Sequence, residues 1–301
     1  MIDEIGGDFL QWLRGFYFVA KNSSLTHACS EMGRNQPAIS HQIKSLEEEF
    51  GVILFDRSRG KMELTVEGKA FLEKTVSIFE IVKEMKWKFS KDYLENRGEI
   101  TIAASHAIIH YFLPKFIIAF SEKFPEVNFT LEGGGVDIIL ERVNLAEADF
   151  GIASLNAIPD SILYLDLFET NLHLIAPKNN NFFHSRKPSL ETIAKAPFIF
   201  FPHSSSISPQ IKNVFEEKCL KLNVAIVLNN FESVKKYVEL GKGVSILDDY
   251  TLEEDDKNRF DIYDVNRFFK RRTYGLIMRK HKYISPPTSA FLRYVKPDIN
   301  F

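Results

Sequence analysis

The sequence lacks the usual marks of secreted, metal-bound and membrane proteins. It holds only two cysteines in 301 residues, Cys29 and Cys219, and neither belongs to a C-x-x-C pair, so neither a disulfide framework nor a zinc module is expected. No apolar stretch reaches the ~18 residues needed to span a bilayer, and no N-terminal run combines a basic start with a long apolar segment. We therefore expect a cytoplasmic protein that does not contact a membrane.

A strong charge of one sign is also missing. The formal net charge is -2, so any contact with nucleic acid must come from a local surface and not from bulk charge. Three enzyme motifs are absent from the sequence: a G-x-G-x-x-G after a strand, a Walker A lysine and a G-x-S-x-G turn. We expect neither an enzyme nor a bound cofactor. Apolar residues make up 45% of the chain, enough for about two to three domains at roughly 100–150 residues each.

The clearest pattern lies between residues 24 and 64. One short helix is predicted over 25–32, and Gly33 follows it where a turn residue belongs. A second helix is predicted from Gln36, because Asn35 is a good N-cap, Pro37 suits a first turn and apolar residues recur every three or four positions. With a preceding helix over 9–21, this pattern predicts a helix-turn-helix whose last helix reads DNA.

A small β-wing is predicted after this helix. A β-prone run at 52–55 and the pair Glu63-Leu64 flank a turn that carries Arg57, Arg59 and Lys61, which suit phosphates or the minor groove. Each of these cations taken singly could equally be a solvated loop residue. The whole winged domain is predicted to cover residues 1–66.

A long linker helix is predicted over 67–97, capped by Thr65. Its apolar seam consists of Leu72, Val76, Phe79, Val82, Met85, Phe89 and Tyr93. A seam of this length exceeds what a small winged domain can cover, so we expect the helix to hold two chains together as a homodimer.

From residue 98 strands and helices alternate, which predicts an α/β fold with parallel, doubly wound sheets. The alternation restarts near Asn171, so two similar lobes are expected: lobe I over 98–168 and 272–301, and lobe II over 169–271. The predicted strands are 100–104, 127–131, 150–153, 172–176, 198–201, 224–228, 244–247, 260–263 and 273–278, and the predicted helices are 108–124, 136–146, 190–195, 207–220, 231–240 and 287–295. The final strand and helix are expected to return to lobe I.

The N-terminal segments Gln36-Pro37-Ala38-Ile39-Ser40, Leu54-Phe55 and Leu64-Thr65 resemble the DNA-binding domain of LysR-type transcriptional regulators. Downstream, the runs 124–127 and 147–154 resemble the effector-binding region of the branch that includes activators of cysteine biosynthesis and sulfur assimilation. The resemblance implies a winged helix-turn-helix, a dimerising linker helix and two Rossmann-like lobes of the periplasmic-binding-protein kind, with a ligand cleft between them.

This resemblance implies a regulator that binds double-stranded DNA at a promoter inverted repeat, as a dimer or tetramer. The predicted DNA-binding residues are Thr26, Arg34, Asn35, Gln36, Pro37, Ser40, His41, Lys44, Arg57, Arg59 and Lys61. His41 departs from the family pattern, in which an arginine or another long basic residue is common. Two alternatives stay open: a cytoplasmic solute-binding protein and an enzyme built on the two lobes.

The predicted effector is a small molecule, an anion or organic acid, held in the cleft between the lobes. Its predicted binding residues are Ser105, His106, Ala107, Ile108, Gly134, Ser154, His203, Ser204, Ser205 and Ser206. They lie at strand ends ahead of helix starts, where ligands of open α/β sheets bind and where backbone amides attract negative charge.

Other interpretations of the same residues stay open. The serines could simply cap helices, and the glycines at 133–135 could form a flexible connection or let the backbone approach a ligand closely. His106 and His110 are spaced for one face of a helix, but no third metal ligand is spaced beside them, so no metal site is predicted.

Overall fold

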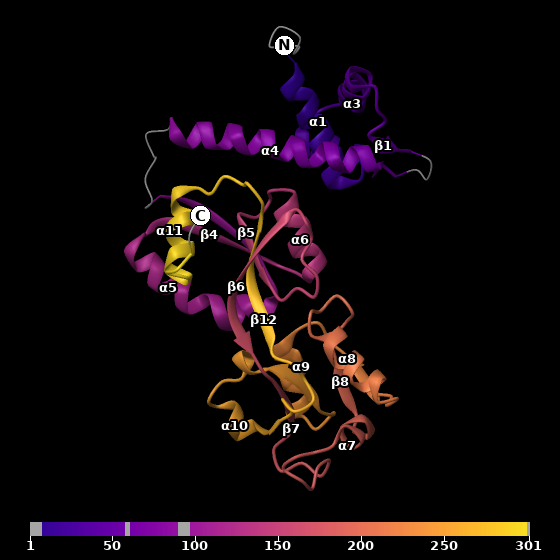
Figure 1. Ribbon diagram of the computed structural model, residues 1–301, viewed down its shortest axis with the longest axis vertical. Coiled ribbons are helices and arrows are strands. Elements are labelled where there is room, and N and C mark those ends of the chain that lie inside the picture. Colours follow the sequence, from indigo (N-terminus) through magenta and orange to yellow (C-terminus); the bar gives the residue numbers. More distant parts are fainter. Residues whose placement is uncertain (1–7, 58–60, 90–96, 300–301) are drawn as a thin grey trace. The chain divides into compact units, whose positions relative to one another are not determined.

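The computed structural model describes residues 8–57, 61–89 and 97–299 (Figure 1). The contacts divide the chain into two compact units, Met1–Lys91 and Asp92–Phe301. The predicted border between the linker helix and the effector region, at residues 97 and 98, stays a prediction. In the described parts of the chain, no helix combines the length and apolarity needed to cross a membrane.

The first unit begins with three helices, α1 (Phe9–Asn22), α2 (Leu25–Met32) and α3 (Gln36–Phe50). Their ends are fixed as the sequence predicts. The Asn35 side chain accepts a hydrogen bond from the Ala38 amide at 3.0 Å and so caps α3. Gly33 and Gly51 take left-handed conformations, with φ of 61° and 65°, and end α2 and α3. The three helices share one core, which includes Leu13, Phe16, Ala28, Ile39, Ile43 and Leu46.

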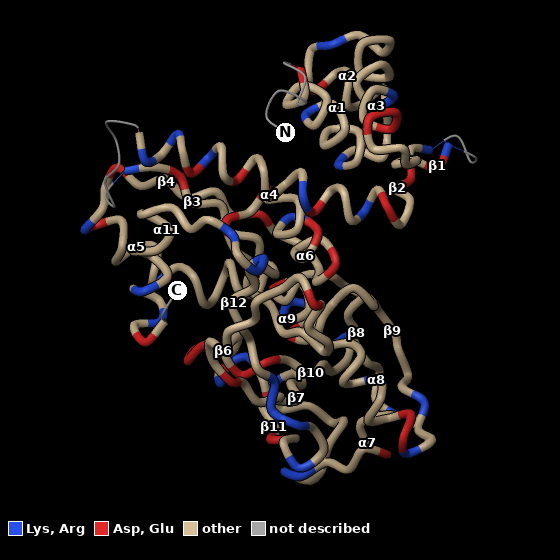
Figure 2. The backbone as a smooth tube through the Cα atoms, turned by 45° about the horizontal axis from the view of Figure 1, so that its top comes forward, with Lys and Arg blue, Asp and Glu red and all other residues tan. Residues whose placement is uncertain are grey.

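The wing and the linker helix complete this unit. Strand β1 (Phe55–Asp56) pairs antiparallel with β2 (Glu63–Leu64), and Thr65 caps α4 (Val66–Lys88) by accepting from the Gly68 amide at 2.9 Å. Figure 2 shows both signs of charge along α4 and around α3.

The predicted apolar seam of α4 falls into two parts. Val76 is buried, and Leu72 and Phe79 pack against the core of the three helices. Farther along, Met85 and Phe89 are exposed, as is Ile81. Tyr93 lies outside the described residues. The first half of the seam therefore serves its own unit, and the second half offers apolar surface.

The second unit contains two lobes. Lobe I is built from β3 (Arg97–Ala104), η2 (Ile108–Phe112), α5 (Leu113–Lys123), β4 (Glu126–Gly133), α6 (Val136–Asn144), β5 (Phe150–Ala153), β6 (Ile162–Thr170), β12 (Arg272–Arg279) and α11 (Pro286–Val295). Lobe II is built from β7 (Leu172–Pro177), α7 (Leu190–Lys195), β8 (Phe198–Phe200), α8 (Ser208–Glu217), β9 (Val224–Val227), α9 (Phe231–Glu239), β10 (Ser245–Asp248), η3 (Asp249–Thr251), α10 (Asp256–Arg259) and β11 (Phe260–Asp264).

The sheets are mixed, whereas the alternation of strands and helices predicted parallel ones. In the lobe I sheet, of order β4-β3-β5-β12-β6, strand β12 runs antiparallel to both of its neighbours. It does so because it brings the chain back from lobe II, while β6 leads into that lobe. In lobe II, β7 lies between β10 and β11 and is antiparallel to each, while β8 and β9 are parallel. Strand β6 is not among the strands predicted from the sequence.

The helix predicted over 108–124 is irregular at its start. Residues Ile108–Phe112 form a π-helical turn, in which the Leu113 amide donates to the Ile108 carbonyl, and the α-helix follows from Leu113. Pro114 has no N–H to donate, so the regular bonding pattern is interrupted at this point and a wide turn costs less here than elsewhere. The turn lies at the edge of lobe I that faces the cavity described below.

Candidate DNA interface and effector cavity

The predicted DNA-reading face of α3 is accessible. Gln36, His41 and Lys44 are exposed on it, and Ser40 is half-buried. The flanking residues Thr26, Arg34, Asn35 and Pro37 are exposed as well. The opposite face of the helix is closed, since Ile39, Ile43 and Leu46 are fully buried in the core. From Gln36 to Lys44 the exposed face of the helix therefore presents polar side chains and one proline to a partner.

A groove lies between α3 and the wing. It is lined by Ser40, His41, Lys44, Glu47, Ile53, Phe55, Asp56, Arg57 and Thr65. Glu47 joins its two walls: its Oε1 accepts from the Leu54 amide at 2.9 Å, and its Oε2 lies 3.4 Å from Arg57 Nη2. Lys61 is exposed on the wing, and Arg59 lies outside the described residues. Through these contacts Glu47 holds the wing against the reading helix.

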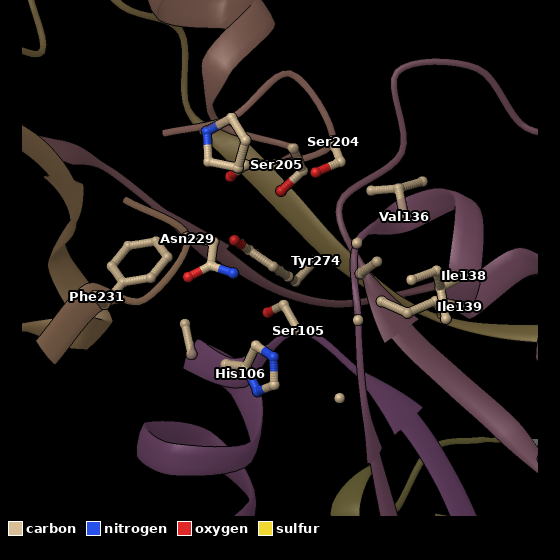
Figure 3. A pocket seen from close by; sticks show the side chains of 17 residues that line it. Ser105, His106, Val136, Ile138, Ile139, Ser204, Ser205, Asn229, Phe231 and Tyr274 are labelled. Carbon is tan, nitrogen blue, oxygen red and sulfur yellow. The ribbon is translucent and has the colours of Figure 1, made fainter. Parts of the chain in front are cut away.

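A cavity of about 260 Å³ lies between lobe I and lobe II (Figure 3). Its lining is Ser105, His106, Ala107, Gly133, Gly134, Gly135, Val136, Ile138, Ile139, Ala153, Pro202, Ser204, Ser205, Ser206, Asn229, Phe231 and Tyr274. Figure 3 shows the polar groups of Ser105, Asn229 and Tyr274 gathered at its centre, with apolar side chains on either side. Segments that are far apart in the sequence thus meet at one place.

Several hydrogen-bond donors line this cavity. Ser105 Oγ accepts from the Ile108 amide at 3.4 Å, which is the capping role left open by the sequence, so its own proton is free to donate to a ligand. The helical turn that begins at His106 and helix α6, which begins at Val136, both start at the cavity wall. The first amides of a helix have no acceptor within it and carry partial positive charge. Among the described residues, no carboxylate lines the cavity.

A buried ion pair stands behind the cavity. Arg272 Nη1 lies 2.5 Å from Asp248 Oδ2, and Arg272 Nη2 donates to Ser206 Oγ at 2.6 Å. Burial is the largest single influence and works against the Arg272 charge, but the Asp248 carboxylate together with Tyr274 and Tyr250 outweighs it, so the pKa of the guanidinium is raised. Burial raises the pKa of Tyr274 to about 12, so its hydroxyl stays protonated and donates to Asp248 Oδ2 at 3.2 Å.

The glycines at 133–135 let the backbone lie close to other parts of the protein, whereas the sequence suggested a flexible connection or a close approach to a ligand. A Cβ on Gly133 would come within 2.4 Å of the His106 ring. A Cβ on Gly135 would come within 2.8 Å of the Ser204 carbonyl oxygen, which belongs to the other lobe. The lobes therefore meet at Gly135, and any larger residue there would push them apart.

Three predicted effector residues do not line the cavity. The Ile108 side chain is fully buried in the lobe I core, because the helical turn directs it away from the opening, so the expectation that it contacts a ligand is corrected. Ala153 takes the place expected for Ser154. His203 is exposed and lines a surface hollow with Phe215 and Cys219 instead, because the turn after β8 carries it outward.

Asn229, Phe231 and Tyr274 were not predicted as lining residues. Asn229 lies two residues before α9 and Phe231 is its first residue; because this helix was predicted, the rule that placed serines at strand ends could have found both. Nothing in the sequence signals Tyr274. No group of three histidine, cysteine or acidic side chains in the described ranges could hold a metal ion.

Two family models match the chain. The bacterial regulatory helix-turn-helix protein, lysR family, matches residues 10–69, and the LysR substrate binding domain matches residues 94–299. This chain belongs to the LysR family. It is a LysR-type transcriptional regulator with a DNA-binding domain and an effector-binding domain.

Relatives of this LysR-type regulator extend over nearly its whole length. It is 27% identical over 290 residues to the RuBisCO operon transcriptional regulator of Allochromatium vinosum, a match that covers 95% of each chain. It is 26% identical over 286 residues to the HTH-type transcriptional regulator CysB of Burkholderia cenocepacia, covering 94% of this chain and 91% of CysB. CysB represents the sulfur-assimilation branch to which the sequence pointed.

The fold of the LysR-type regulator is shared with solved structures. A full-length OxyR variant from Pseudomonas aeruginosa superimposes with a TM-score of 0.71 at 18% identity, and the match covers 95% of this chain and 92% of the OxyR chain. The relatives are named as transcriptional regulators, which agrees with the absence of enzyme motifs.

Proposed function

We propose that this regulator binds a small anion with an apolar portion in the cavity between its lobes, and that it reads a promoter inverted repeat as a dimer or tetramer. The observation that carries the effector proposal is the donor-rich lining of the cavity. Ser105 and Ser206 each accept a hydrogen bond within the protein, so each hydroxyl can act as a donor at the cavity, and Ser206 also interacts with the Tyr274 hydroxyl in the same lining. Donors without nearby carboxylates favour an acceptor that carries negative charge.

The apolar part of the ligand is inferred from the walls of the cavity. Val136, Ile138 and Ile139 line one side, and Phe231 lines the other (Figure 3). No lysine or arginine lines the cavity among the described residues, so negative charge would be met by amides and hydroxyls alone. A cavity of about 260 Å³ is smaller than most drug-sized sites, which start at roughly 300 Å³. These features favour a short organic acid over a bare inorganic ion such as sulfate.

The experiment is a thermal-shift screen of the full chain against sulfate, thiosulfate, O-acetylserine, short organic acids and aromatic acids. A ligand that binds the native state stabilises it through mass action, by about 2.7 kcal/mol at a concentration one hundred times its Kd. This stabilisation raises the melting temperature. We expect organic acids to give the largest shifts, and Ser105→Ala to reduce them.

The matched control is Ser185→Ala, because Ser185 is an exposed serine of the same unit that lies outside the cavity. This control should keep the wild-type shifts. Equal shifts for wild type and Ser105→Ala, or no shift with any anion, would refute the proposed effector site.

A further inference from the structure

Arg272 does not line the cavity, yet it contacts a residue that does. It is the first residue of β12 in lobe I, and its side chain is 4% exposed. Its two terminal nitrogens contact two residues of lobe II: Nη1 lies against Asp248, the last residue of β10, and Nη2 donates to Ser206 on the cavity wall. One guanidinium therefore connects the cavity to the place where the chain crosses between lobes.

The direction of the hydrogen bonds gives this contact a chemical consequence. A guanidinium only donates, so Ser206 Oγ must accept from Arg272 and its own proton must donate elsewhere. A positive donor on the oxygen strengthens the O–H as a donor in turn, since hydrogen bonds in a chain polarise one another. Without Arg272, the Ser206 hydroxyl could rotate and present a lone pair to the cavity.

Asp248 holds Arg272 in place. Its carboxylate is fully buried, and its Oδ2 receives Arg272 at 2.5 Å and the Tyr274 hydroxyl at 3.2 Å. Tyr274 lines the cavity too, so two side chains of its lining, Ser206 and Tyr274, are oriented by the same ion pair.

We propose that Arg272 is a positioning residue that makes the cavity selective for hydrogen-bond acceptors, because it fixes Ser206 as a donor from behind. Asp248 keeps the guanidinium in place and ties this donor to the junction of the lobes. The proposal rests on the proposed effector site.

The test measures the binding of sodium isobutyrate and sodium sulfate to the full chain by calorimetry, at constant ionic strength. The variants are Ser206→Ala, Arg272→Lys and the double variant. Each single change should weaken the better-bound anion about 10-fold, the size expected for one hydrogen bond to a charged group. If Arg272 acts through Ser206, the double variant should match Ser206→Ala within about 2-fold.

A matched control is Arg271→Lys, which changes the neighbouring arginine. Its side chain is 69% exposed and contacts only Glu169, at 3.3 Å, among the ion pairs of the described residues. This variant should bind as wild type does. A further test variant combines Asp248→Asn with Arg272→Gln. It removes both buried charges together and leaves no unpaired charge, so it should fold and still lose about 10-fold in affinity.

The outcomes separate the two proposals. If wild type binds neither anion, the effector site itself is refuted. If wild type binds but Arg272→Lys or the uncharged pair keeps full affinity, the role of Arg272 is refuted and the site stands. A loss of affinity of about 100-fold in the double variant would also refute the role of Arg272. It would mean that the two changes act independently, because independent effects on binding add in free energy.

Discussion

The proposed DNA-reading surface and the proposed effector cavity differ in how much of the chain each one needs. The described reading surface comes from residues 26–61, a single stretch whose helices are fixed by local caps. The cavity draws on segments near residues 105, 134, 205, 230 and 274, which two sheets and two crossings between lobes bring together. A site of the first kind can be recognised from local sequence, whereas the second depends on the whole effector region.

The largest expected effect tests whether the two regions are also independent in stability. In lobe II, the fully buried Lys235 Nζ lies 2.6 Å from Asp256 Oδ2, whose residue is also buried. Asp256→Ala would leave the lysine charge without its closest partner, and losing one member of a buried pair costs about 3–5 kcal/mol. The neighbouring exposed Asp255→Ala should cost little.

Urea unfolding shows whether the two units unfold independently, because both tryptophans, Trp12 and Trp87, belong to the first unit. Asp256→Ala should lower the midpoint seen by far-ultraviolet circular dichroism and leave the tryptophan fluorescence midpoint unchanged. A fluorescence midpoint that moves by the same amount would mean that the two units unfold together.

A second prediction separates two roles within the reading surface. Gln36 can pair in bidentate fashion with adenine, so Gln36→Ala should relax base preference at one position of each half-site, at about 1–3 kcal/mol. Arg57→Ala should weaken all DNA sequences alike and reduce the dependence of binding on salt. Fluorescence anisotropy with matched and single-base-changed duplexes at two salt concentrations measures both. The same response from the two variants would show that the roles are wrongly assigned.

A third prediction concerns the two halves of α4. Phe79 packs edge-on to Tyr17 at 6.0 Å within its own unit, so Phe79→Glu should destabilise the DNA-binding unit, by about 1–3 kcal/mol. Met85 is 55% exposed, so Met85→Glu should leave the fluorescence midpoint unchanged but separate dimers held through this helix. Light scattering that still reports dimers for Met85→Glu would place the dimer contact elsewhere.

The smallest expected effect depends on pH. Hydrogen bonds from Arg259, and then from Lys236, lower the pKa of Glu239 to about 2. A depressed pKa stabilises the folded state above the unfolded pKa, and this contribution is lost as pH falls from about 5 toward 2. Glu239→Gln should therefore lower the melting temperature slightly at pH 7, and the difference from wild type should shrink on acidification. A constant difference across this range would contradict the assignment.

The sequence predicted those parts of the molecule that local interactions decide. Asn35, Thr65 and Gly33 behave as expected, and the order of strands and helices in the lobes was largely predicted. Strand β6 was missed because only Asn171 separates it from β7, so no intervening helix marked it as an element of its own. The reversed direction of β12 depends on the path of the chain between lobes, which a pattern of alternation does not contain.

Prediction of the cavity failed where side-chain direction mattered. Ile108 and His106 are two positions apart on one turn, and that spacing directs one into the core and the other to the cavity. Arg272 and Tyr274 could not be found, because their relevance depends on Asp248 and Ser206, which are separated from Arg272 by 24 and 66 positions.

Lobe II is an insertion within lobe I. The chain leaves through Asn171, between β6 and β7, and returns between β11 and β12, so two covalent connections join the lobes. They lie side by side, since Thr170 and Arg272 are paired partners in the sheet. Two adjacent connections allow one lobe to swing toward the other, but they oppose rotation of one lobe against the other about the line that joins them. A single connection would allow that rotation. A backbone cut at Asn171 would restore that freedom without releasing lobe II.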